Sequence, residues 1–199
     1  MTPKRSMVFT LAALAVASSV PPLLISAEQP QINVAVVIGA QTVPLGVAHR
    51  FDDSASLLPR PGELQTLNAH DTGHGGHTYC YRFRTRGGEA LLELFDSEFG
   101  LHTARMTKVA GRKVRDCPKL AAEPRFVVGS THFSLRATKA LPPAGFRATR
   151  GPEGLSFERE WTQSGAPAAC VSRSISIDVE PSEGAVRAIT VQNWEEPGC

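Results

Sequence analysis

The feature that constrains the fold most is a partial internal repeat. At an offset of 83 residues, five positions in a window of seventeen carry the same residue twice: Gly46, His49, Leu58, Pro59 and Gly62 match Gly129, His132, Leu141, Pro142 and Gly145. Unrelated sequence of ordinary composition would give about one identity in such a window. The repeat predicts two copies of one structural unit, residues 28–120 and 121–199, that together form one compact domain.

Each unit is predicted to begin with a short apolar strand and a glycine turn, followed by a short helix that ends at a proline. The first strand is expected at Ile32–Ile38 in one unit and at Arg125–Val128 in the other. Leu58 precedes Pro59, and a residue before proline is disfavoured in the helical region. The second helix is expected to have Ser130 or Thr131 as its N-cap. Its predicted apolar face contains Phe133, Ala137, Ala140 and Leu141.

Alternating apolar and polar residues then predict antiparallel strands in both units. In the first unit these strands are expected at 79–84, 89–95 and 101–109, with turns at 86–88 and 96–100. In the second unit they are expected around residues 155–161, 171–179 and 189–191. The predicted fold class is therefore α+β, with two tandem units that each consist of a short helix and an antiparallel meander. Whether the units share one sheet stays open.

Four cysteines, Cys80, Cys117, Cys170 and Cys199, follow the N-terminal segment. An even number in an exported chain indicates disulfides, and no pair has the short spacing typical of a zinc ribbon. Four cysteines allow three connectivities. If the repeat is real, the simplest has one disulfide per unit, which joins Cys80 to Cys117 and Cys170 to Cys199.

The order of elements resembles that of the secreted beta-lactamase inhibitor proteins, which have two helix-plus-meander units in tandem. It is also similar to the single-unit outer-membrane lipoproteins of the SmpA/BamE type. The residues that carry the resemblance are Tyr81-Arg82-Phe83 and Leu92–Phe95, in the strand pair after the first helix. Pro59 and Pro61 interrupt the longer first helix of that family. The resemblance implies the same fold class, and no binding residue of the family is carried over.

The N-terminus is typical of an export signal. Lys4 and Arg5 precede an apolar run, and the Pro21-Pro22 pair would break a membrane-spanning helix. We expect a signal peptide over residues 1–27, no transmembrane segment after its cleavage, and a periplasmic or secreted product. The whole chain has a formal charge of +2, and its leader carries two of the basic residues. The mature chain is therefore neutral, which disfavours nucleic acid as a partner.

One glycine-rich segment contains four possible metal ligands within eight residues: His70, Asp71, His74 and His77. Imidazole and carboxylate groups are suitable ligands for zinc or copper. The glycines favour a loop, which would have to become ordered on binding a metal ion. A periplasmic metal-binding or metal-dependent protein that uses this loop is the alternative functional hypothesis, and the same segment can also be an ordinary surface connection.

The main functional hypothesis is an exported, non-enzymatic binding or inhibitor protein without a cofactor. It would recognise another extracytoplasmic protein or a cell-envelope polymer. The predicted binding residues are of the aromatic and arginine types that interfaces favour: Tyr79, Tyr81, Arg82, Arg84 and Trp161. No nucleophile elbow, phosphate loop or dinucleotide fingerprint is present, which lowers the case for an enzyme.

Charge is unevenly distributed along the chain, and this predicts a dipolar surface. A basic run in the first unit contains Arg105, Lys108, Arg112, Lys113 and Arg115, and Arg82, Arg84 and Arg86 precede it. The acids cluster elsewhere, at Glu93, Asp96 and Glu98 in the first unit and at Glu153, Glu158, Glu160, Asp178, Glu180 and Glu183 in the second. Such a surface can recognise a charged partner or an anionic cell-envelope polymer, and the same charges can also be an ordinary solvated strand face.

Overall fold

The computed structural model describes residues 32–67, 75–109, 116–137, 140–164, 170–182 and 185–197, which belong to one compact unit, Ile32–Cys199. Strands dominate it. They are β1 (Val34–Ile38), β2 (Gln41–Pro44), β3 (Gly62–Leu67), β4 (Gly76–Thr85), β5 (Gly88–Ser97), β6 (Gly100–Lys108), β7 (Pro124–Val128), β8 (Thr131–Phe133), β9 (Arg147–Gly151), β10 (Gly154–Ser164), β11 (Cys170–Ser182) and β12 (Ala185–Pro197). The described helices are α1 (Phe51–Ser54) and the 3-10 turn η1 (Ala55–Leu57). No helix among the described residues is long and apolar enough to cross a membrane.

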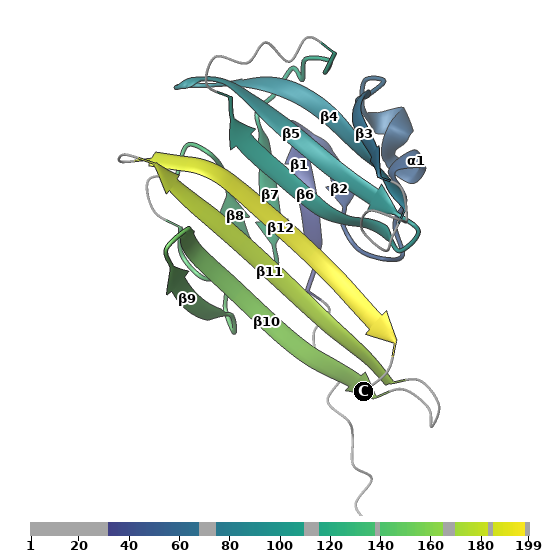
Figure 1. The fold of residues 1–199 in the computed structure, drawn as a ribbon, viewed down its shortest axis with the longest axis vertical. Helices are drawn as coiled ribbons and strands as arrows, with labels where there is room; N and C mark the ends of the chain where they lie inside the picture. The colour runs from purple at the N-terminus through teal and green to yellow at the C-terminus, as the bar shows by residue number, and fades with distance from the viewer. Residues whose placement is uncertain are drawn as a thin grey trace, which may run out of the picture. The chain divides into compact units, whose positions relative to one another are not determined.

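The strands form two antiparallel sheets (Figure 1). The smaller sheet has the order β2-β1-β7-β8, and the larger has the order β3-β4-β5-β6-β12-β11-β10-β9. Both orders are symmetric about a pair of strands from different halves of the chain, β1 with β7 and β6 with β12. The elements β1–β6 in one half therefore correspond to β7–β12 in the other. The predicted boundary at residues 120/121 lies between β6 and β7.

The predicted α+β class is wrong, because the described fold consists of β-sheets with one short helix. In the first half the helical segment ends as predicted, since Leu58 is extended before Pro59. In the second half, Thr131–Phe133 is strand β8, where we predicted the helix. Gly129 has a φ of 59° and turns the chain back on itself, so that Phe133 pairs with Phe126 of β7. Pairing with β7 overrides the weak helical spacing of the apolar residues.

The offset assigned to the repeat is also wrong. Gly39 and Gly129 occupy equivalent turns, between β1 and β2 and between β7 and β8, with φ values of 62° and 59°. These positions are 90 residues apart, whereas Gly46, which we matched to Gly129, lies beyond the end of β2. Cys80 and Cys170 are not equivalent either, because Cys80 is on β4 and Cys170 begins β11. The two halves correspond in the order of their strands. A match of a few glycines and prolines in the sequence does not show which strands correspond.

The core lies between the two sheets. We call the face of the eight-stranded sheet that packs against the smaller sheet its inner face, and the opposite face its outer face. Side chains of the inner face and of the smaller sheet form one buried apolar cluster; its fully buried members include Val36, Val43, Leu92, Leu94, Met106, Phe126, Ile177 and Val191. Hydrogen bonds also join the sheets, because Gly46 N–H donates to Leu101 O and the Asn193 side chain donates to Leu45 O. The inner face of the large sheet is thus buried in the core.

Candidate recognition surface on the eight-stranded sheet

Strand alternation separates four of the five predicted binding residues. Tyr79 and Tyr81 are on the inner face, where the Tyr79 ring stacks on Phe51 at 4.0 Å and Tyr81 is fully buried. The Tyr81 hydroxyl donates to Pro59 O, and burial raises its pKa above the usual value. Arg82 and Arg84 are at the intervening positions of β4 and therefore belong to the outer face. The two tyrosines stabilise the fold and are not exposed for binding by the outer face.

The fifth predicted binding residue, Trp161, lies far along the sheet on β10. It is on the inner face, where it packs against the edge of the core. The guanidinium of Arg159 lies 5.8 Å from the centre of its ring, within the range of a cation–π interaction. The structure therefore does not bring Tyr79, Tyr81, Arg82, Arg84 and Trp161 together on one surface.

Three of the four predicted metal ligands, His70, Asp71 and His74, lie outside the described residues. The fourth, His77, is exposed at the start of β4, with its ring 6.0 Å from the ring of Tyr79. Within the described ranges, no group of three histidine, cysteine or acidic side chains is placed to hold a metal ion. Zinc or copper binding by the glycine-rich loop stays a prediction.

The predicted disulfide between Cys80 and Cys117 is confirmed, with a Cα–Cα distance of 5.3 Å. Both cysteines are buried, and they pack with Leu91 on the outer side of the sheet. Cys199 and the side chain of Cys170 lie outside the part of the chain that the structure describes, so the Cys170–Cys199 disulfide stays a prediction. The confirmed bond fixes the segment that follows Cys117 against the edge of β4. There, Arg82 N–H donates to Pro118 O, and Leu120 N–H donates to Arg82 O.

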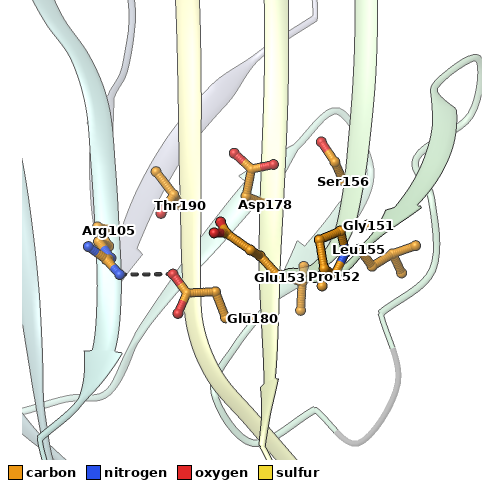
Figure 2. Close-up of a pocket in the computed structure, with 11 residues that line it drawn as sticks. Arg105, Gly151, Pro152, Glu153, Leu155, Ser156, Asp178, Glu180 and Thr190 are labelled. Atoms are coloured by element: carbon orange, nitrogen blue, oxygen red, sulfur yellow. Dashed lines mark hydrogen bonds and ion pairs between the residues drawn. The ribbon is translucent and has the colours of Figure 1, made fainter.

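The outer face is hollowed where β6, β12, β11 and the β9–β10 turn meet (Figure 2). The depression has a volume of about 480 Å³ and is lined by three acids and one arginine among its polar residues. The full lining is Arg105, Gly151, Pro152, Glu153, Gly154, Leu155, Ser156, Asp178, Val179, Glu180 and Thr190. Its residues come from both halves of the chain, because β6 and β12 are neighbours in the sheet.

Glu180 is neutralised by two arginines. Arg105 Nη2 lies 2.8 Å from Glu180 Oε1, and Arg187 Nη2 lies 2.5 Å from Glu180 Oε2. The hydrogen bond from Arg187 is the main cause that lowers the pKa of the Glu180 carboxyl, with burial opposing and Arg105 assisting. Asp178 and Glu153 make no ion pair with another described residue. The depression therefore contains two carboxylates whose charge is not matched within the described part of the chain.

The acids of β10 and β11 extend this negative region across the outer face. Glu158 and Glu160 alternate with inner residues along β10, as Asp178 and Glu180 do along β11. The same outer face also contains basic residues from strands of the first half. These are Arg82 and Arg84 of β4 and Arg105 of β6. Basic residues also lie among these acids, since Arg105 pairs with Glu180 and Arg147 is in register with Glu158, so the dipolar surface stays a prediction. Of the other basic residues in the predicted patch, Arg86 and Lys108 are described, and those at 112, 113 and 115 lie outside the described ranges.

Glu93 is opposite Arg105 on the outer face, and its side chain is partly buried. Burial raises the pKa of Glu93 above its usual value, and the charge of Arg105 opposes part of this rise. Because the pKa is raised on folding, the ionised carboxylate destabilises the folded chain. The contribution of Glu93 to stability is therefore fully present below the pKa that this carboxyl has in the unfolded chain. It is lost as the pH rises through the pKa that the carboxyl has in the folded chain.

We expect Glu93→Gln to remove this loss of stability. Urea unfolding of both proteins between pH 3.5 and 7.5, a range of about four units around the usual glutamate pKa, measures the effect. The difference in unfolding free energy should grow in favour of the glutamine variant as the pH rises. A difference that is constant with pH would contradict the direction of the Glu93 shift.

A buried Ser97–His102 pair was missed in the sequence, where His102 is a single histidine on a strand. Ser97 Oγ lies 3.4 Å from His102 Nδ1, which is the pairing of a nucleophile and its base. However, His102 Nδ1 lies 2.8 Å from Gly100 O and so must donate its proton there. Ser97 Oγ also accepts the Phe99 N–H, and both side chains are buried. The pair stabilises the β5–β6 turn, and its geometry does not activate the serine.

Comparison of the chain with protein-family models, curated proteins and solved structures finds no match. The resemblance to the beta-lactamase inhibitor proteins therefore stays a prediction, and the outer-face depression has to be interpreted from its own chemistry.

Proposed function

We propose that this chain is an exported binding protein that recognises a basic segment of another extracytoplasmic protein through the acidic part of its outer face. The observation that carries the proposal is the depression in which Asp178 and Glu153 form no ion pair with a described residue. Export is supported by the predicted leader and by the buried Cys80–Cys117 disulfide, since disulfides persist in oxidising compartments.

The chemistry of the depression favours a guanidinium or ammonium group. Asp178 and Glu153 can accept charge-assisted hydrogen bonds, and the hydroxyl groups of Ser156 and Thr190 are further acceptors. Glu180 is already paired with two arginines, Arg105 and Arg187, so Asp178 and Glu153 are the carboxylates left to bind a cation. A volume of about 480 Å³ is in the usual range of ligand pockets. The surrounding Glu158 and Glu160 would steer a basic partner toward the site.

Binding of a short arginine-rich peptide, measured by fluorescence anisotropy, tests the proposal. We expect saturable binding that weakens with added salt, and about tenfold weaker binding for the Asp178→Asn, Glu153→Gln double variant, since two charge pairs are lost. Glu89→Gln is the matched control, because Glu89 is an exposed acid at the other end of the sheet. The proposal fails if a glutamate-rich peptide of equal length binds as tightly, or if the double variant binds like the wild type.

A further inference from the structure

A cluster of three aromatic rings lies on the outer face, outside the core. It consists of Phe95 of β5, His102 of β6 and Trp194 of β12, and we call it the outer aromatic cluster. The ring centre of His102 lies 3.9 Å from that of Trp194 and 5.2 Å from that of Phe95. His102 is fully buried, whereas Phe95 and Trp194 are partly exposed and do not belong to the core. Part of the indole ring of Trp194 is therefore accessible from the outer side.

Trp194 lies on the same strand and the same face as part of the acidic depression. Val191 of β12 points into the core, so Thr190 and Trp194, at odd distances from it, point to the outer face. Thr190 lines the depression, and Trp194 is four residues further along β12. Because an antiparallel strand rises about 3.4 Å per residue, the two positions are about 14 Å apart.

The outer face between the depression and Trp194 carries small, amide or acidic side chains. The Ser176 hydroxyl donates to Gln192 Oε1 across β11 and β12 at 3.1 Å. Arg147 is further out, on β9, in register with Glu158. The described outer side chains of β10, β11 and β12 in this region include no basic residue; they are Glu158, Glu160, Ser174, Ser176 and Gln192. The region between the two features is therefore suited to a positively charged chain.

Two exposed carboxylates flank Trp194. Glu196 follows it by two residues on the same face of β12, and Glu160 is opposite Ser174, which is itself opposite Trp194. Neither acid forms an ion pair with another described residue. A guanidinium group can stack on an indole ring and donate hydrogen bonds to carboxylates at the same time. An ammonium group is more strongly hydrated and does not stack in this way.

We propose that the bound basic segment is an extended peptide with two arginines four residues apart, one in the acidic depression and one stacked on Trp194. This inference rests on the proposed function and specifies the chemistry of the partner. In an extended chain, every second side chain points to the same side, so residues four apart share a side and are about 14 Å apart. That spacing matches the distance from Thr190 to Trp194. The acids beside Trp194 favour this cation over a neutral ligand.

Fluorescence anisotropy of labelled peptides with the exported, oxidised protein tests the spacing. Three peptides of equal length contain two arginines that are two, four or six residues apart, with serine and threonine elsewhere. A fourth peptide has two lysines four residues apart. We expect the four-residue arginine spacing to bind about fivefold more tightly than each of the other three, since only that peptide reaches both the depression and the indole ring with guanidinium groups.

Variants at the two tryptophans test the role of Trp194. Trp194→Ala should weaken binding of the four-residue spacing about fivefold and so remove its advantage. Trp194→Phe keeps an aromatic ring beside His102 and should retain part of the advantage. Trp161→Phe is the matched control, because Trp161 lies on the inner face against the core. The chain has two tryptophans, so in this control Trp194 is the only one, and its emission should change saturably with the same Kd as the anisotropy.

Several outcomes would overturn the inference and leave the proposed function standing, provided that the Asp178→Asn, Glu153→Gln variant still weakens binding. These are equal affinity for all three spacings, a lysine pair that binds as tightly, a Trp194→Ala protein that keeps the preference, and Trp194 emission that stays constant at saturation. Emission that responds to cellohexaose, a neutral oligosaccharide, and not to the peptides would overturn it in favour of a sugar. A protein that binds no arginine peptide would overturn both proposals.

Discussion

Replacing Cys80 and Cys117 together with alanine is expected to lower the free energy of unfolding by about 4 kcal/mol. The two cysteines are 37 residues apart, and the bond closes a loop that contains β5 and β6. In the chain-entropy model, a loop of this length restricts the unfolded chain by about 4 kcal/mol. The bond also fixes the 118–120 segment on the edge of β4. A small domain with a stability of about 5–15 kcal/mol would lose a large share of it.

Urea unfolding of the oxidised wild type and of the double variant, followed by tryptophan fluorescence, measures this effect. The double variant is preferable to single ones, because a single replacement leaves a free thiol that can exchange with the other cysteines. An alanine pair that unfolds within about 1 kcal/mol of the wild type would show that the loop is already restricted in the unfolded chain.

Phe126→Ala is expected to cost about 3–5 kcal/mol, because Phe126 lies at the centre of the smaller sheet and is fully buried. It is in register with Val36 on one neighbouring strand and with Phe133 on the other. Removal of the ring leaves a cavity between two sheets, and sheet backbones that are hydrogen-bonded on both sides cannot collapse to fill it.

Arg125→Ala is the matched control for Phe126→Ala, because Arg125 is the exposed neighbour on the same strand. It should change the unfolding free energy by no more than about 0.5 kcal/mol. Denaturation midpoints and slopes of both variants, compared with the wild type, check the prediction. A loss below about 1.5 kcal/mol for Phe126→Ala would contradict the position of β7 in the core.

Strands β4, β5 and β6 were predictable because local sequence determines them, whereas β2 and β3 were not predicted. Alternation along Tyr79–Arg84 and glycines at the turns give β4, β5 and β6 close to their observed bounds. In the second half, the strands expected at Arg125–Val128 and around 155–161, 171–179 and 189–191 are observed as β7, β10, β11 and β12. The helix was mispredicted there because β8 is only three residues long and depends on its pairing with β7. Spacing alone could not distinguish such a strand from a short helix. Sheet order, which places β6 beside β12, depends on contacts that no local pattern encodes.

The candidate site was partly visible in the sequence. Alternation already implied that Tyr79 and Tyr81 point to the opposite side of β4 from Arg82 and Arg84, and the predicted binding set ignored this. The acids at alternate positions, Glu158 with Glu160 and Asp178 with Glu180, were a usable signal for an acidic sheet face. The depression itself could not be predicted from the sequence. It forms only because Arg105 of β6 and Thr190 of β12 are paired across the two halves of the chain.

The symmetric strand order affects how the chain folds. Strand β1 pairs with β7 on one side, and β6 pairs with β12. Either half alone would therefore leave one edge of each of these central strands unpaired. The β1 strand finds its β7 neighbour about ninety residues later in the chain. Contacts this distant in sequence slow folding and prolong exposure of apolar strands. On the proposed export route, N-terminus first, the first half would lack these neighbours until the second half follows, in a state that chaperones are suited to protect.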